Sequence, residues 1–479
     1  LNRIFVKILE DDLNSYIYDA TLSGCRARVA TIPSGFSVSV SGYAEKLPHL
    51  MDVVTGRMLS IISEMKAGDS SGLKLKFDKA VKNLLRETKN FRLESPYETA
   101  SYVSRMLLED NVWHVRNYIA EMEGKYADAN PLSLLECATV AEESLTKRLS
   151  ATFLCMGNIN EKEALDAMNL LDKHFLSKAR PLHLEEMPKL RSLKMPTRAE
   201  ATRIFGQDVK DAKIPLVLEE VAHSESEENH AVEVILQVGS EHELGYEGIG
   251  ILELIGQIAY NSAYNQLRTK EQLGYIVSCF TRKTAGSAVG LSVIVQSSTT
   301  KPIELEERVE AWLETFRQEL ADMSPNDLAN EAAAIVAQLL ERNMKLGDEI
   351  ATAWGSVVST STQGSFYSKP AFDRHRLLAD VLTVEGVITE DEESCVEKKP
   401  IKSASNLKKE VLKMFDNHIA ASSDKRRAIV VRVYSKKAED DYKHNIGRAG
   451  YLSSFEDVRQ VKQFLSVWPT APYWLKTKE

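Results

Sequence analysis

The stretch "NQLRTKEQLGYIV", Asn265 to Val277, gathers a cation, an amide, a glycine and a tyrosine into one short turn. Arg268 carries a guanidinium whose planar fork of N–H donors keeps its charge at all ordinary pH values. Tyr275 carries a phenolic hydroxyl that can donate or accept a hydrogen bond. Together the two residue types are suited to holding a carbonyl group or a developing negative charge. They also have a structural interpretation, because a cation near a helix C-terminus favours the helix dipole and a tyrosine at a strand start is often half-buried.

The elements around this stretch decide whether the two side chains can act together. Residues 249–272 have apolar residues at helical spacing, Leu273 and Gly274 form a glycine stop, and "YIVSCF" is typical of a strand. Arg268 is therefore expected in the last turns of a helix and Tyr275 at the start of the next strand. We expect both side chains to project from the same end of one domain.

Other chemistry has little support in the sequence. Zinc hydrolases whose metal ligands lie on a helix need two histidines one turn apart with a glutamate beside them, and no two of the ten histidines are three or four residues apart. "GIG" at 248–250 lacks the third glycine of a dinucleotide loop, and neither a phosphate loop nor a G-x-S-x-G nucleophile elbow is present. The sequence therefore predicts no metal bound by this chain and no nucleotide cofactor.

Two separated segments repeat with the same displacement. "GFSVSVSGY" at 35–43 alternates as a strand does, and "GLSVIVQSS" at 290–298 repeats it 255 residues later. An amphipathic run follows each strand, at 47–65 and at 303–320, and "NLLRE" at 83–87 and "QLLER" at 338–342 are again 255 residues apart. The shared order predicts two related domains.

The domain boundary is expected in the proline-punctuated stretch 180–200, which gives domains 1–205 and 206–479. After it, "IPLVLEEVA" from Ile214 and "AVEVILQV" from Ala231 read as a hairpin around the polar turn 223–229. Strands interleaved with long helices predict an α+β fold with mixed or antiparallel sheets. Residues 389–406 are expected to be a charged surface loop, and 455–469 a short amphipathic helix stopped by proline.

Composition narrows the functional classes. The chain has 479 residues, is 43% apolar and carries a net charge of -9, which argues against nucleic acid as a partner. No apolar run approaches the roughly 20 residues that span a bilayer, so a membrane partner is not expected either. Five dispersed cysteines indicate reduced thiols, and a cytoplasmic location is the default expectation. Because the chain opens on Leu1 rather than Met, we expect it to be a fragment.

The segment "LRTKEQLGYIV" at 267–277 closely resembles the signature in the C-terminal half of the insulysin and pitrilysin family, which includes insulin-degrading enzyme and nardilysin. The resemblance extends in order along nearly the whole chain, through "SGY" at 41–43, "NFRLESPYETASY" at 90–102, "MGNI" at 156–159, "IVQS" at 294–297 and the terminal "FEDVRQVKQFLSVWP".

This resemblance implies a zinc metalloendopeptidase built from four homologous α+β domains of the mitochondrial-processing-peptidase type. Its two halves close around a peptide. Residues 1–205 would be the third domain and 206–479 the fourth. The family's H-x-x-E-H zinc motif lies in its first domain, so zinc is expected in the full-length enzyme and none in this chain. The implied partners are the N-terminal catalytic half and peptide substrates, and a homodimer is compatible with the same interpretation.

The family draws an arginine and a tyrosine seven positions apart from this signature into its catalytic chamber, and they match Arg268 and Tyr275. Their implied roles are to bind the substrate backbone and to donate a hydrogen bond to the carbonyl oxygen of the cleaved bond. Alone, the chain is expected to be inactive. Two alternatives remain open at this point: a non-enzymatic core subunit of the same fold, and a peptide-binding module that uses an exposed strand edge.

Overall fold

The computed structural model describes residues 1–68, 71–91, 93–110, 112–124, 132–183, 186, 191–210, 212–284, 288–358, 374–385, 402–444 and 446–469. Most of the charged loop predicted at 389–406 lies outside these ranges. The chain divides into two compact units, of which unit 1 comprises 1–91, 115–188 and 345–350, and unit 2 comprises 92–114, 189–344 and 351–479. Helix α12 (Leu346–Val358) crosses this division. None of the described helices is long and apolar enough to cross a membrane.

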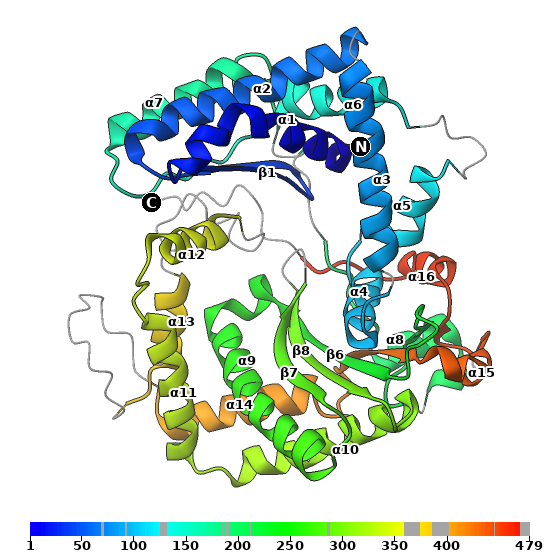
Figure 1. Cartoon of the computed structure of the whole chain (residues 1–479). Coiled ribbons are helices and arrows are strands. Elements are labelled where there is room, and N and C mark those ends of the chain that lie inside the picture. The colour runs from blue at the N-terminus through cyan, green and yellow to red at the C-terminus, as the bar shows by residue number, and fades with distance from the viewer. Residues whose placement is uncertain are drawn as a thin grey trace. The chain divides into compact units, whose positions relative to one another are not determined.

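Unit 1 consists of helices packed on a small hairpin. Strands β1 (Arg26–Ile32) and β2 (Gly35–Ser41) pair antiparallel, and helices α1 (Asn2–Leu22) and α2 (Leu47–Ala67) pack against them (Figure 1). The core is formed mainly by the apolar faces of these helices, with Phe5, Val54 and Met58 fully buried. The remaining elements of unit 1 are α3 (Ser71–Phe91), α5 (Val115–Met122), α6 (Leu134–Glu142), η2 (Glu143–Lys147), β3 (Arg148–Leu149), α7 (Glu161–Leu171), η3 (Asp172–Leu176) and β4 (Arg180–Pro181).

Unit 2 is built around a mixed six-stranded sheet in the order β10-β5-β9-β6-β8-β7. The strands are β5 (Val217–Val221), β6 (His230–Ser240), β7 (Ile276–Lys283), β8 (Ala288–Ser297), β9 (Arg427–Tyr434) and β10 (Tyr451–Leu452). β5 is parallel to both β10 and β9, whereas β6, β7, β8 and β9 pair antiparallel. The α+β fold with a mixed sheet and long helices is therefore confirmed for this unit.

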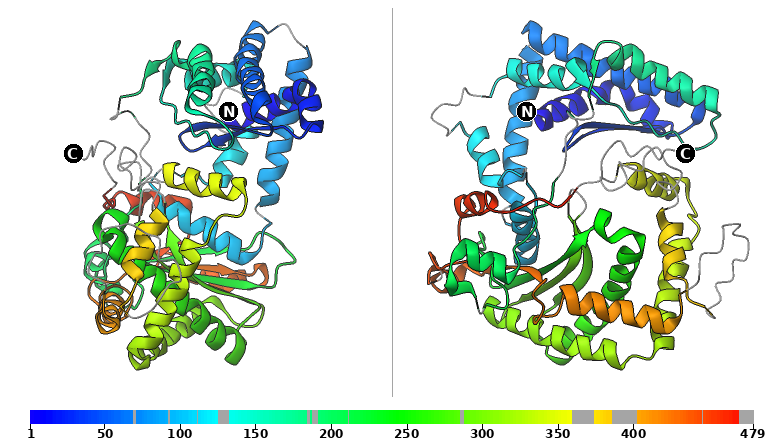
Figure 2. Two further views of the ribbon diagram at one scale, coloured as in Figure 1. Left: turned by 90° about the vertical axis from the view of Figure 1, so that its left-hand side faces the viewer. Right: turned by 180° about the vertical axis from the view of Figure 1, so that it is seen from behind.

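Both faces of this sheet are covered, so β6 is buried along its whole length. Val232, Val234 and Leu236 face helices α9 (Glu241–Ala263), α10 (Pro302–Asp322) and α14 (Ala404–His418). Ala231 and Ile235 face α4 (Pro96–Leu108) on the other side. Figure 2 shows these helices around the sheet from two further directions. The other helices of unit 2 are α8 (Arg198–Phe205), α11 (Pro325–Leu340), α13 (Arg374–Leu382), α15 (Glu439–Lys443) and α16 (Phe455–Lys462).

The repeat predicted from the sequence is confirmed by the order of elements. Helix, strand, strand, helix, helix occurs as α1–β1–β2–α2–α3 in unit 1 and as α9–β7–β8–α10–α11 in unit 2, apart from the short helical segments between these elements. In both copies the two strands pair antiparallel.

The predicted hairpin between residues 214 and 238 is wrong. β5 and β6 are not neighbours, because β9 lies between them, parallel to β5 and antiparallel to β6. Buried charge holds β9 in this place: Arg432 Nη1 contacts Glu219 of β5 at 3.1 Å and its Nη2 contacts Glu306 of α10 at 2.7 Å.

Candidate functional site

Arg268 lies on a widened turn at the end of a long helix. The helix predicted at 249–272 begins earlier, at Glu241, and changes at Tyr264 into a π-helical segment, η6 (Tyr264–Lys270). In this segment the N–H of Glu271 donates to the carbonyl of Gln266, five residues back, at 2.9 Å. π-Helical turns are rare and occur often at functional sites. The wide turn therefore sets the position from which the Arg268 side chain leaves the helix.

The Arg268 guanidinium lies against two tyrosine rings. Its central carbon is 4.7 Å from the ring centroid of Tyr264 and 4.7 Å from that of Tyr275, and its Nη1 donates to the Tyr264 hydroxyl. A guanidinium over an aromatic face is attracted by the ring quadrupole. The structure thus brings together Arg268 and Tyr275, as the sequence predicts, and adds Tyr264 to them.

The turn between the two residues is tightly constrained. Leu267 is fully buried and Leu273 nearly so, and the N–H of Leu273 donates to the carbonyl of Leu267 at 3.0 Å. Gln272 has a φ of 53°, a left-handed conformation that costs energy for a residue with a side chain. Gly274 passes so close to β8 that a Cβ atom there would lie 1.8 Å from the carbonyl oxygen of Gln296. Tyr275 therefore starts from a backbone with little freedom.

Glu271 connects the end of this helix to α10. Its carboxylate accepts two bonds from Arg308, at 2.6 and 2.7 Å, and one from the Gln266 side-chain amide at 2.8 Å. The bond from Arg308 lowers the pKa of Glu271, because it stabilises the charged carboxylate. In this anchored turn Tyr275 is exposed and Arg268 is half-buried.

Tyr275 is 81% exposed, while Tyr264 is 37% exposed and Tyr260, one turn earlier, is 47% exposed. The arrangement presents a positioned cation and an accessible phenol on one surface, which can donate hydrogen bonds to carbonyl oxygens. The roles of Arg268 and Tyr275 toward a substrate stay a prediction. Sequence reasoning missed Tyr264, although its position four residues before Arg268 places it on the same side of a helix.

The described part of the chain contains no group of three or more His, Cys, Asp or Glu side chains placed to hold a metal ion. His174 has Asp52 as partner at 2.7 Å, and the ring of buried His230 accepts a bond from the N–H of Ser435 at 3.0 Å. Both histidines therefore have structural partners, and the described residues do not fit zinc.

Comparison with known proteins shows which protein domains this chain resembles. Residues 1–121 match the family described as the middle or third domain of peptidase M16, and residues 254–354 match the C-terminal lobe domain 4 of PQQ synthase PqqF-like proteins. The chain is similar in fold to the crystal structure of pitrilysin, with a TM-score of 0.71 at 17% identity, over 97% of this chain and 41% of that one. These are domains of a metallopeptidase architecture.

Two relatives show the same similarity in sequence. Human insulin-degrading enzyme is 28% identical over 358 residues, which cover 74% of this chain and 31% of that protein. The peroxisomal insulin-degrading enzyme-like 1 of Arabidopsis thaliana is 26% identical over 442 residues, which cover 91% of this chain and 39% of that protein. The chain is therefore similar to the insulysin and pitrilysin peptidases, and its matched segments are similar to a middle domain and a C-terminal lobe domain. It spans well under half the length of these relatives.

Proposed function

We propose that this chain is the C-terminal, non-zinc-binding half of a zinc metalloendopeptidase that degrades peptides in a closed chamber. In this proposal Arg268 and Tyr275 contact the peptide. The observation that carries it is the Arg268 guanidinium held between the rings of Tyr264 and Tyr275 beside an exposed phenol. The similarity to insulin-degrading enzyme and to the peptidase M16 middle domain supports the same assignment.

The chemistry assigns a different task to each side chain. The Tyr275 hydroxyl donates a hydrogen bond to the carbonyl oxygen of the bond to be cleaved and stabilises the negative charge that develops there. The Arg268 fork donates to main-chain carbonyls of the peptide and holds it in register. Because Tyr264 and the constrained turn fix both groups in advance, little ordering is needed when the peptide binds.

The zinc ion of the intact protein belongs, in this proposal, to the missing N-terminal half. The described residues of this chain do not fit a metal, so no step is assigned to zinc here. The partners proposed are that N-terminal half and extended peptides, in the cytoplasm, with a homodimer as a further assembly and neither nucleic acid nor membrane as a partner.

The test is peptide cleavage by the 479-residue chain combined with an N-terminal half of the family. Tyr275→Phe should lower turnover by about tenfold to a thousandfold, because it removes one donor to the developing oxyanion. Arg268→Ala should mainly raise KM, because it removes contacts made equally to the ground state and the transition state. Tyr43→Phe, at an exposed tyrosine of unit 1, is the matched control and should cleave like the unaltered protein.

Unchanged turnover in Tyr275→Phe and Arg268→Ala, with folding intact, would return the pair to a structural role. The chain without the N-terminal half should not cleave peptides. Robust, EDTA-sensitive cleavage by the 479-residue chain alone would contradict the proposal.

A further inference from the structure

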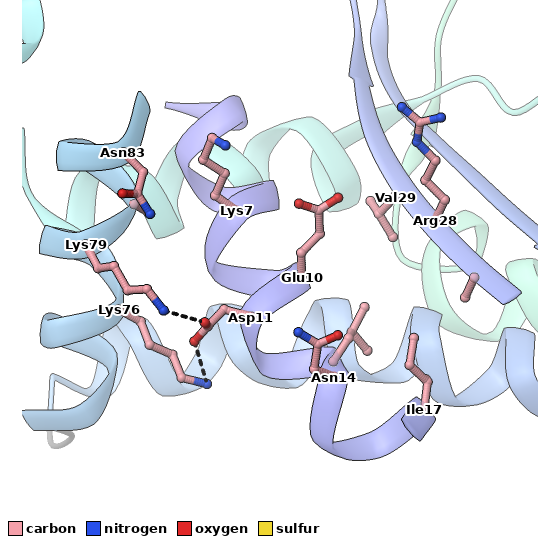
Figure 3. Close-up of a pocket in the computed structure, with 13 residues that line it drawn as sticks. Lys7, Glu10, Asp11, Asn14, Ile17, Arg28, Val29, Lys76, Lys79 and Asn83 are labelled. Carbon is pink, nitrogen blue, oxygen red and sulfur yellow. Dashed lines mark hydrogen bonds and ion pairs between the residues drawn. The ribbon is translucent and has the colours of Figure 1, made fainter. Parts of the chain in front are cut away.

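A groove of about 410 Å³ lies among α1, β1 and α3 of unit 1, whereas Arg268 and Tyr275 belong to unit 2. One side is formed by Ala27, Arg28 and Val29 of β1, and the opposite side by Lys76 and Lys79 of α3, with α1 between them (Figure 3). The groove therefore runs beside a strand edge.

This strand edge carries main-chain groups without a strand partner. Among the described strands β1 pairs only with β2, and a two-residue turn joins Ile32 to its cross-strand partner Gly35. In such a hairpin the closing pair exchanges hydrogen bonds, and every second residue of the strand does so too. Arg28 therefore bonds across to Ser39, whereas Ala27 and Val29 direct their N–H and C=O groups away from β2. Ala27 and Val29 both line the groove, together with Arg28.

The charged side chains that line the groove are Lys7, Glu10 and Asp11 of α1, Lys76 and Lys79 of α3, and Arg28 of β1. On the α3 side, Lys79 pairs with Asp11 at 2.9 Å and Lys76 pairs with Asp12 at 2.9 Å. Arg28 on β1 is exposed and has no ion pair among the described residues (Figure 3). Since residues of adjacent strands that lie opposite each other share a face, an acidic residue of an added strand would meet Arg28.

The α1 side of the groove combines apolar residues with the polar side chains of Glu10 and Asn14. Leu13 and Ile17 of α1 line it, and Val29, only 2% exposed, points to the same side of the hairpin. A strand lying beside β1 would alternate, with one set of side chains on the Arg28 face and the other over Leu13 and Ile17.

We propose that this groove binds an extended peptide that adds to the edge of β1 as a further strand, with an acidic residue facing Arg28 and apolar residues over α1. Main-chain bonds to Ala27 and Val29 supply the affinity, and Arg28 supplies selectivity for acidic residues. The inference goes beyond the proposed function, because such binding needs neither Tyr275 nor a metal.

The experiment measures fluorescence anisotropy of a capped, fluorescein-labelled Val-Glu-Val-Glu-Val peptide on the 479-residue chain. Arg28→Glu should weaken binding by about tenfold or more, because it places like charges together. A Val-Lys-Val-Lys-Val peptide should then bind the variant better than the unaltered chain. Lys162→Glu on α7, an exposed charge reversal in the same unit, should leave the affinity for both peptides unchanged.

A second variant tests the main-chain bonds. Ala27→Pro removes an N–H that points away from β2, so the hairpin should keep its ladder while the added strand loses a donor. Should that variant not fold, hydrogen exchange of the unaltered chain decides, because bound peptide must slow exchange in residues 26–32. Absence of binding up to millimolar protein would overturn the inference, and so would binding that neither Arg28→Glu nor the exchange pattern ties to β1.

Discussion

Arg268 is held by its surroundings before any ligand arrives. The π-helical turn, the left-handed Gln272 and the tyrosine rings together fix where its guanidinium lies. Strained backbone of this kind persists only where the surrounding packing enforces it, and buried Leu267 and Leu273 supply that packing. We interpret the turn as a rigid support that fixes the positions of the Arg268 and Tyr275 side chains.

Tyr264→Phe tests whether contact with the Tyr264 hydroxyl positions the Arg268 guanidinium. The change removes the hydroxyl that accepts from Nη1 but keeps the ring beneath the guanidinium. In the combined two-half protein we expect KM to rise about threefold to tenfold with little change in kcat, because a single exposed hydrogen bond from the charged guanidinium is lost. Tyr260→Phe, whose ring neighbours Tyr264 at 6.4 Å, is the control, and equal effects of both changes would argue against the positioning role.

Gly274→Ala tests the close approach of the turn to β8. The added Cβ would collide with the carbonyl oxygen of Gln296, and a backbone atom cannot swing away as a side chain does. We expect a loss of about 3 kcal/mol in the free energy of unfolding, measured by urea denaturation. Gly347→Ala, where a Cβ meets nothing within 4 Å, should lose no stability. Similar stability of both variants would show that β8 yields at this point.

At the residue scale, the sequence predicted that Arg268 and Tyr275 lie at the same end of one domain. It did not predict that Tyr264 contacts Arg268. Helix end and strand start could be recognised from apolar spacing and Gly274, and these bring the two side chains to one end of the domain. The change from α- to π-helix depends on how the last turn packs on its neighbours, which a single sequence does not reveal. Tyr264 could still have been found from its spacing, because it lies four residues before Arg268.

Among the elements, long helices and the strands joined to them were predictable, whereas sheet order was not. β2, β8, α2 and α10 were found close to their observed bounds, because their periodicity is local. The predicted hairpin of β5 and β6 was wrong. Strands that follow each other in sequence are neighbours in a sheet in only roughly two-thirds of cases. β9 arrives from far along the chain, and its buried residues from Ala428 to Tyr434 face cores on both sides of the sheet. The terminal helix also ends at Lys462, before the predicted proline stop at 469.

His230 at the start of β6 makes the sheet sensitive to pH. Burial lowers the pKa of His230, because the charged ring is poorly solvated there. The unfolded chain takes up a proton at a pH near 6.5, whereas the folded chain does so only at lower pH. Stability is therefore complete above about pH 6.5 and falls as the pH drops toward the lowered pKa.

His230→Asn should reduce this loss, because asparagine can accept the Ser435 N–H bond and does not titrate. The measurement is the free energy of unfolding in urea at about pH 7.5 and 5.5, where the unaltered chain should lose up to about 1 kcal/mol more than the variant. Equal losses in both proteins would remove His230 as a cause of the pH dependence.

At the scale of the whole molecule, the two units have separate hydrophobic cores. One contains Phe5, Val54 and Met58, and the other is split by the six-stranded sheet into two layers. We expect calorimetry to show more than one unfolding transition, because each core can lose its packing by itself. Met58→Ala, at a fully buried residue of unit 1, should cost about 2 to 5 kcal/mol and lower one transition only. A single two-state transition that shifts as a whole in this variant would contradict independent units.

The late position of β9 in the chain affects how the protein is made. β6 ends at Ser240 and its central neighbour β9 begins only at Arg427. At roughly 5 to 20 residues per second, a ribosome needs on the order of ten to forty seconds to synthesise the intervening segment. During that time the apolar edges of β5 and β6 are complete but cannot pair with β9. Nascent unit 2 is therefore a natural client for chaperones that shield exposed strands until translation passes Tyr434.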